Sequence, residues 1–172
     1  MEIKKYQKVA STNTLAKRIG PQNWQIIWAQ EQSAGYGRNN NRWFSPPGGL
    51  YFSIILPQSK VEDLQILTIL AAFIVAKILT EDFGLEAFIK LPNDVYIKQK
   101  KVAGILTENV VSRKVKFSVM GIGLNTNIEK FPQELENRAT SLKIELGKKV
   151  ENEEVLKKIT QELKRQLATI SE

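Results

Sequence analysis

The central stretch of the chain, residues 61–83, constrains the fold most. Its apolar residues recur at positions 61, 64, 67, 70, 71, 74, 75 and 78, which is the spacing of a helix with a wide buried face. The most apolar part, residues 66–76, is 11 residues long, well below the roughly 20 that span a bilayer. We therefore predict a buried helix that needs a second layer of structure to cover it.

Runs typical of β-strands lie on both sides of this helix. Strands are predicted at residues 3–9, 24–29, 50–56, 86–89, 94–97, 102–110 and 115–122. Short connections at 98–100 and 112–114 indicate hairpins, further helices are predicted at 11–18 and 151–170, and residues 126–150 are predicted to be mostly loop. This order favours an α+β fold in which helices pack on one face of a mixed, largely antiparallel sheet. The 172 residues leave room for one such domain.

Composition narrows the chemistry. The absence of cysteine and histidine excludes disulfides, thiolate or histidine zinc sites, thiol nucleophiles and histidine-based triads. The net charge of +7 is spread evenly, with 12 basic and 8 acidic residues in the first 100 and 13 and 10 in the rest. We therefore expect no specific binding of DNA. No secretory signal is visible, so a cytoplasmic protein without a membrane association is predicted.

A segment rich in glycine and asparagine, residues 30–49, is the first candidate functional region. It has no hydrophobic periodicity, and structureless segments of this length are usually functional or disordered. Gly35 and Gly37 let backbone amides approach an anion, and Arg38 and Arg42 add forked cationic donors. A plain surface turn would explain the glycines and asparagines equally well. Trp43 favours a binding loop, which we expect to be mobile until a ligand orders it.

A predicted hairpin is the second candidate region. Its Pro-Asn-Asp sequence at 92–94 is also a common turn signature, and a hairpin lysine is ordinarily exposed to solvent. If residues 94–97 pair with 101–105, however, Asp94 and Lys101 come within reach of one ligand, and Ala103 and Gly104 leave room for it. A third stretch, residues 121–127, lacks the third glycine of a dinucleotide fingerprint. It is better explained by a strand that passes close beneath a ligand or another strand.

Taken in chain order, these stretches resemble the catalytic domain of biotin protein ligases, also called biotin-[acetyl-CoA-carboxylase] ligases. The matching segments are Ser11-Thr12-Asn13 and residues 32–38, 43–53, 90–94, 101–108, 121–127 and 139–142. The resemblance implies a class II synthetase-like fold. It also implies that residues 1–172 form one catalytic domain, without the N-terminal DNA-binding domain of some members and without the small C-terminal β domain that usually follows.

The resemblance further implies an ATP-dependent ligase that works in two steps. Biotin and ATP, with Mg²⁺ present, would give biotinyl-5′-AMP, and a lysine of a biotin carboxyl carrier domain of acetyl-CoA carboxylase or a similar carboxylase would then be biotinylated. No protein nucleophile is needed, which agrees with a chain that lacks cysteine and histidine. The expected partner is the carrier domain, and a homodimer is left open.

The family's motifs assign overlapping roles to residues of this chain. The resemblance implies a biotin-binding group of Ser11, Thr12, Asn13, Gln32, Tyr36, Gly37, Arg38, Lys101 and Gly104. It implies an ATP-binding group of Arg38, Trp43, Asn93, Asp94, Lys101 and Asn125. Arg38, Asp94 and Lys101 would be catalytic, and Asp94 is the candidate ligand for Mg²⁺.

Three positions depart from the family's pattern. Tyr36 and Asn41 stand where arginines are usual, which predicts weaker loop closure or weaker retention of the intermediate. Leu91 stands where a tryptophan is usual, and this change would remove an aromatic wall beside the biotin pocket. Two alternatives stay open: a lipoate-type ligase, and a module that binds biotin or biotinyl-adenylate without turnover. The thiol-dependent octanoyltransferases are excluded because the chain has no cysteine.

Overall fold

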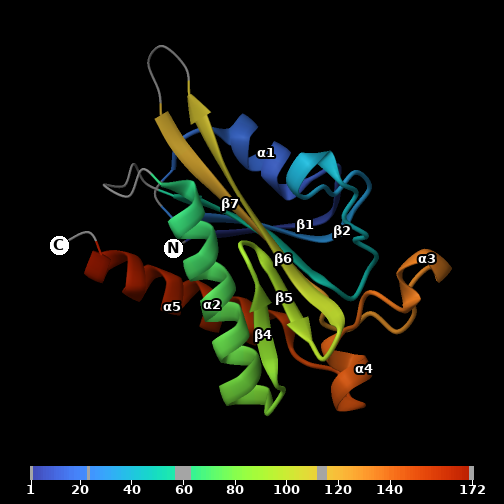
Figure 1. The fold of residues 1–172 in the computed structure, drawn as a ribbon. Helices are drawn as coiled ribbons and strands as arrows, with labels where there is room; N and C mark the ends of the chain where they lie inside the picture. Colours follow the sequence, from blue (N-terminus) through green and yellow to red (C-terminus); the bar gives the residue numbers. More distant parts are fainter. Residues whose placement is uncertain (1, 23, 57–62, 112–115, 171–172) are drawn as a thin grey trace.

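A mixed sheet of seven strands forms the centre of the molecule, in the order β1-β2-β3-β7-β6-β5-β4 (Figure 1). The computed structural model describes residues 2–22, 24–56, 63–111 and 116–170. Its strands are β1 (Glu2–Val9), β2 (Gln25–Gln32), β3 (Leu50–Leu56), β4 (Ala87–Lys90), β5 (Asp94–Ile97), β6 (Lys100–Val111) and β7 (Lys116–Leu124). β1 and β2 are parallel, and the other neighbouring strands are antiparallel. The predicted mixed, largely antiparallel sheet is confirmed.

The helices within the described residues are α1 (Thr12–Ile19), α2 (Leu64–Phe83), α3 (Gln133–Glu136), α4 (Leu142–Leu146) and α5 (Asn152–Ile170), with a 3-10 turn η1 at Arg38–Asn40. α2 begins after Asp63, whose carboxylate accepts a hydrogen bond from the amide of Gln65. It ends at Gly84, where a φ of 65° favours glycine. The predicted helix start at Val61, the strand end at Pro57 and the connection at 112–114 lie outside the described residues.

Hydrophobic layers cover both faces of the sheet. The larger layer holds α2 and α5 and includes Ile26 and Phe52 (Figure 1). The smaller layer holds α1, where Ala16 packs with Ile27 and Ile55. Because side chains alternate along a strand, the neighbours Ile26 and Ile27 point into opposite layers. The α+β class is confirmed, with one correction: α1 lies on the other face, because β3 is buried on both sides and needs cover on each.

Helix α2 is, among the described helices, the one long and apolar enough to cross a membrane. Its 20 residues exceed the 11-residue apolar part on which the sequence argument relied. Half of its most apolar 18-residue window is nevertheless buried inside this fold, where α2 contacts β4, β5, β6 and α5. This burial is typical of the core helix of a globular protein, as predicted.

Candidate functional site

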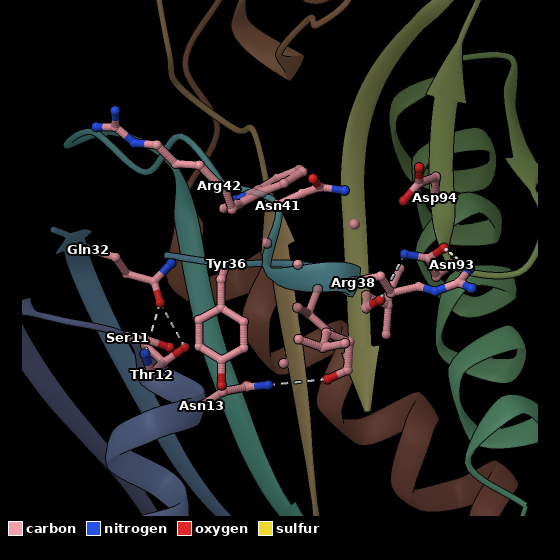
Figure 2. Close-up of a pocket in the computed structure, with 18 of the residues that line it drawn as sticks. Ser11, Thr12, Asn13, Gln32, Tyr36, Arg38, Asn41, Arg42, Asn93 and Asp94 are labelled. Atoms are coloured by element: carbon pink, nitrogen blue, oxygen red, sulfur yellow. Dashed lines mark hydrogen bonds between the residues drawn. The ribbon is translucent and has the colours of Figure 1, made fainter. Parts of the chain in front are cut away.

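A pocket of about 340 Å³ lies where the start of α1, the segment after β2 and the strands β5, β6 and β7 meet (Figure 2). It is lined by Ser11, Thr12, Asn13, Gln32, Tyr36, Gly37, Arg38, Asn39, Asn41, Arg42, Trp43, Asn93, Asp94, Lys101, Gly104, Ile105, Leu106, Gly121, Ile122 and Gly123. All nine residues predicted to bind biotin are in this lining. Of the six predicted to bind ATP, five line this pocket, and Asn125 does not.

Buried hydrogen-bonding side chains form one end of the pocket. The amide and hydroxyl of Thr12 donate to Oε1 of Gln32 at 2.8 and 3.2 Å. The hydroxyl of Ser53 lies 2.6 Å from Oδ1 of Asn13 and 2.8 Å from the hydroxyl of Thr12. These groups are in place because Ser11 caps α1 and accepts a hydrogen bond from the third amide beyond it, that of Thr14. The helix start therefore presents polar groups to the pocket rather than to solvent.

The segment between β2 and β3 folds over this pocket and contains a hydrogen-bonded turn. β2 extends to Gln32, three residues beyond the predicted strand, so the loop starts at residue 33. Within it, the amide of Gly37 donates to the carbonyl of Asn41 at 2.8 Å. Asn39 and Asn40 have φ values of 56° and 57°, a left-handed backbone that asparagine tolerates better than most residues. Gly37 and Asn39 therefore both form the turn and line the pocket.

The two arginines of the loop, Arg38 and Arg42, point in different directions at the pocket. Nη1 of Arg38 donates to Oδ1 of Asn93 at 3.2 Å, which connects the loop to the turn before β5. Figure 2 shows Arg42 extending away from Arg38 and Asn93. Arg38 is therefore the loop cation that faces the acidic side of the pocket, where Asp94 also lies.

Trp43 forms an aromatic wall of the pocket. Its indole lies on the backbone of two strands at positions where glycine leaves space: a Cβ on Gly123 would be 2.7 Å from Cε2 of the indole, and one on Gly104 would be 3.1 Å from Cζ3. The sequence predicted that residues 121–127 pass close beneath a ligand or another strand, whereas in the structure the group that lies over Gly123 is the indole of Trp43. The indole Nε1 is buried without a hydrogen-bond partner among the described residues.

Asp94 and Lys101 form an ion pair in the pocket. Nζ of Lys101 lies 2.6 Å from Oδ1 of Asp94, and 5.1 Å from the ring centroid of Trp43. The pairing of β5 with β6 skips Val102, so that Lys101 lies opposite Tyr96 and on the same face as Asp94. The predicted hairpin pairing is confirmed. The ordinary expectation of an exposed hairpin lysine is wrong here, since the Lys101 side chain is 27% exposed.

A second pocket, of about 490 Å³, lies next to the first and shares Asn41, Arg42, Trp43, Asp94 and Lys101 with it. Its other lining residues are Phe44, Tyr96, Asn125, Phe131, Leu135, Arg138 and Ala139. The amide nitrogen of Asn125 donates to the carbonyl of Thr140 at 3.0 Å, whereas its buried Oδ1 has no partner in the described part of the chain. Buried polar groups are normally paired, so this oxygen is available to a ligand donor.

Sequence reasoning missed a charged cluster behind the pocket. Nδ2 of Asn13 donates to Oε2 of Glu108 at 2.8 Å, and the ammonium of Lys17 contacts Oε1 of Glu108 at 2.6 Å. Burial disfavours the Lys17 ammonium, but its hydrogen bonds to Glu108 and Tyr36 outweigh that effect and raise its pKa. A signal was present, because Lys17 follows Asn13 by four residues and so shares its helix face.

One expectation about the pocket wall is wrong. Leu91, expected beside the biotin pocket, is 69% exposed and is absent from the lining of both pockets. It lies in the turn between β4 and β5, outside the strand alternation that would direct it inward. Leu91 therefore forms no wall of either pocket, and Trp43 is the aromatic that both share.

Comparisons with known proteins agree with this geometry. Residues 6–125 match the Biotin/lipoate A/B protein ligase family. The bifunctional ligase/repressor BirA of Bacillus subtilis is 37% identical over 158 residues, which cover 89% of this chain and 48% of that protein. The biotin-[acetyl-CoA-carboxylase] ligase of Paracoccus denitrificans is 36% identical over 121 residues, or 67% of this chain and 50% of that protein. The chain spans about half the length of these curated relatives.

A solved structure extends the match to nearly the whole chain. The biotin protein ligase from Aquifex aeolicus in complex with biotin and ATP has a TM-score of 0.90 and 32% identity to this chain, covering 99% of it and 72% of that chain. The resemblance and the class II synthetase-like fold predicted from the sequence are thereby confirmed. With the family match covering residues 6–125, the chain belongs to the biotin/lipoate A/B protein ligase family.

Proposed function

We propose that this chain attaches biotin to a lysine of a biotin carboxyl carrier domain, with ATP as the energy source and biotinyl-5′-AMP as the intermediate. The observation that carries the proposal is the pair of pockets that share Trp43, Asp94 and Lys101. One pocket offers a closed polar end, and the other offers aromatic rings, cations and a free buried acceptor on Asn125. The relative from Aquifex aeolicus was solved in complex with biotin and ATP, which supports the proposal that a chain of this family binds both ligands.

The polar end of the first pocket supports biotin over lipoate. Thr12, Asn13, Gln32 and Ser53 place hydroxyl and amide groups in a largely buried environment. The ureido ring of biotin carries two N–H donors and a carbonyl acceptor, whereas the dithiolane ring of lipoate offers no comparable hydrogen bonds. Burying polar groups against a partner that cannot pair with them is unfavourable, so a site of this kind discriminates against the lipoyl ring.

The proposed reaction needs positioned charges rather than a protein nucleophile. A carboxylate oxygen of biotin attacks the α-phosphorus of ATP, a C–O–P anhydride bond forms, and the P–O bond to pyrophosphate breaks. Lys101 and Arg38 would stabilise the negative charge at the reacting phosphate. The neutral amine of the carrier lysine then attacks the biotinyl carbonyl, an amide forms and AMP leaves. Asp94 is placed to take the proton that this amine loses.

Magnesium fits the site as part of the ATP complex. Within the described residues, no three His, Cys, Asp or Glu side chains lie together as a metal-binding group. Asp94 is the one carboxylate in the described lining of the two pockets, and Asn93 adds an amide oxygen beside it. Mg²⁺ commonly binds through one or two carboxylates together with substrate phosphates and water. We therefore propose that Mg²⁺ is held mainly by the ATP phosphates, with Asp94 facing it.

Measurement of the first half-reaction tests the proposed function. The protein is incubated with ATP, Mg²⁺ and either biotin or lipoate, and pyrophosphate and acyl-adenylate are quantified by chromatography. We expect biotinyl-AMP and an equal amount of pyrophosphate with biotin, and at least tenfold less product with lipoate. Preferential use of lipoate would assign the chain to the other branch of the family. Biotin binding without pyrophosphate release would assign it as a binding module.

Arg38→Gly is expected to loosen retention of the intermediate. The guanidinium of Arg38 is the described contact from the tip of the loop to Asn93, at 3.2 Å. Without it, we expect faster escape of biotinyl-AMP and a rise of about tenfold in labelling of lysines on a bystander protein such as serum albumin. Arg42→Gly is the matched loop variant, because Arg42 extends away from Asn93. Equal labelling by the two variants would contradict the role given to Arg38.

A further inference from the structure

Three polar side chains from distant parts of the chain meet at the edge of the first pocket. The hydroxyl of Tyr36 donates to Oε2 of Glu108 at 3.0 Å, and the ammonium of Lys17 lies 2.6 Å from Oε1 of Glu108 and 3.2 Å from the Tyr36 hydroxyl. Lys17 belongs to α1, Glu108 to β6 and Tyr36 to the loop over the pocket. These contacts attach the loop to α1 and to β6, which are distant from it in the sequence.

The same carboxylate also holds a pocket residue. Nδ2 of Asn13 donates to Oε2 of Glu108 at 2.8 Å, while Oδ1 of Asn13 lies 2.6 Å from the Ser53 hydroxyl. Asn13 has little freedom to move, because it lies directly over Gly121, where a Cβ would be 2.8 Å from its Cγ. Both oxygens of Glu108 are thus in use, and one of them receives Tyr36 and Asn13 together. Because Tyr36 and Asn13 donate to the same oxygen, loss of the Tyr36 hydroxyl alters the hydrogen bond that holds Asn13.

The ends of the loop are attached to the same polar end of the pocket. At its start, Gln32 accepts two hydrogen bonds from Thr12 and donates to the Ser45 hydroxyl at 2.9 Å. Ser45 in turn donates to the carbonyl of Trp43 at 3.1 Å near the loop's other end. Tyr36 lies between these two ends in the sequence, and its hydroxyl supplies a third attachment, to Glu108. Loss of the Tyr36 hydroxyl would therefore leave the loop attached at its ends alone.

We propose that Tyr36 is a positioning residue for the biotin end of the pocket: its hydroxyl ties the loop to Glu108, and the Glu108 carboxylate holds the side chain of Asn13 in its place in the pocket lining. The inference rests on the proposed function for the identity of the ligand, but the hydrogen bond between Tyr36 and Glu108 is present without a ligand. Charge-assisted hydrogen bonds are stronger than neutral ones, and both Lys17 and Glu108 are about two-thirds or more shielded from solvent. The cluster is therefore more than a surface ion pair, and its geometry sets the affinity for biotin.

The test compares Tyr36→Phe with Tyr6→Phe, a matched removal of one hydroxyl from β1, where Tyr6 is outside the lining of both pockets. We expect the Kd for biotin, measured by calorimetry, to rise about tenfold in Tyr36→Phe and less than twofold in Tyr6→Phe. In the protein without ligand, amide hydrogen exchange over residues 33–37 is expected to accelerate in Tyr36→Phe alone. The kcat for adenylate formation at saturating biotin is expected to change less than twofold, because the hydroxyl acts on binding.

A double-mutant cycle with Glu108→Ala tests the route through the carboxylate. If Tyr36 acts through Glu108, then Tyr36→Phe has less than a twofold further effect on the Kd for biotin once Glu108 is alanine. A further tenfold effect, or exchange and Kd values in Tyr36→Phe equal to those of Tyr6→Phe, would overturn the proposal. If Glu108→Ala fails to fold, the comparison of Tyr36→Phe with Tyr6→Phe still tests whether the Tyr36 hydroxyl positions the pocket.

Failure of the proposed function gives a different result. A wild-type protein that does not bind biotin would refute the assignment of the ligand. The exchange measurement needs no ligand, and it would still show whether Tyr36 restrains the loop.

Discussion

Lys101→Ala is expected to lower the rate of biotinyl-AMP formation by about 10²-fold or more, the cost commonly seen when one electrostatic contact to a reacting centre is removed. The ammonium of Lys101 lies between Asp94 and the indole of Trp43, where the two pockets join. A carboxylate from one pocket and a phosphate from the other would both approach it. The rate is measured in a single turnover with enzyme in excess, so that product release does not contribute.

Lys100→Ala is the matched control for this change. Lys100 precedes Lys101 on β6, but it lies opposite Ile97 and its ammonium donates to the carbonyl of Glu136 at 2.8 Å on the exposed surface. We expect this variant to retain the wild-type rate within about twofold. Because Lys101→Ala leaves the mostly buried carboxylate of Asp94 without its ion-pair partner, the melting temperatures of both variants are measured to show that each is folded in the assay. A Lys101→Ala protein that adenylates biotin at the wild-type rate would refute the proposed role.

Two glycine substitutions on β7 are expected to impair different halves of the site. An alanine Cβ at Gly121 would collide with the side chain of Asn13, and one at Gly123 would collide with the indole of Trp43. Neither glycine has a positive φ, so the backbone accepts alanine and the collision is the main effect. We expect Gly121→Ala to raise the Kd for biotin, and Gly123→Ala to raise the KM for ATP, each by about 10-fold to 10²-fold.

The two glycine variants serve as controls for each other. Both lie on the same strand, two residues apart, and both replace one hydrogen by a methyl group. Their melting temperatures should be similar, while Gly121→Ala should raise mainly the Kd for biotin and Gly123→Ala mainly the KM for ATP. Calorimetry with biotin and steady-state kinetics with ATP provide the two readings. If the two variants lose the two ligands to the same extent, the assignment of Asn13 to the biotin-binding group and of Trp43 to the ATP-binding group is wrong.

Much of the fold could be predicted because local patterns determine it, whereas most of the pocket lining was predicted through the family resemblance. The part of the predicted helix that the structure describes, residues 64–83, is α2, and the hairpin pairing inferred for residues 94–105 brings Asp94 to Lys101. Small residues at 104, 121 and 123 signalled close approach, although sequence could not identify Trp43 and Asn13 as the groups that approach. The opposite placement of α1 was missed, since a strand buried on both faces resembles any apolar run.

Only part of the cluster that ties the loop could be predicted from the sequence, namely that Asn13 and Lys17 share a helix face. Tyr36 and Glu108 are 72 residues apart, and Lys17 and Glu108 are 91 apart, so their meeting depends on the finished sheet. Position 36 was judged by the arginine that the family usually has there, as a loss of charge. The weaker loop closure expected from that change stays a prediction. The structure shows a contact that this expectation did not include, because the tyrosine hydroxyl reaches a carboxylate that is also bound by Lys17 and Asn13.

Mass spectrometry of a carrier domain tests the central claim most directly. A biotin carboxyl carrier domain with one exposed acceptor lysine is incubated with the protein, ATP and Mg²⁺, and with biotin or lipoate in parallel reactions. The proposed function predicts one added biotinyl group at the acceptor lysine, no modification without ATP, and little or no lipoylation under the same conditions. An unmodified carrier in the biotin reaction, with the protein folded and the carrier active with another biotin ligase, would contradict it.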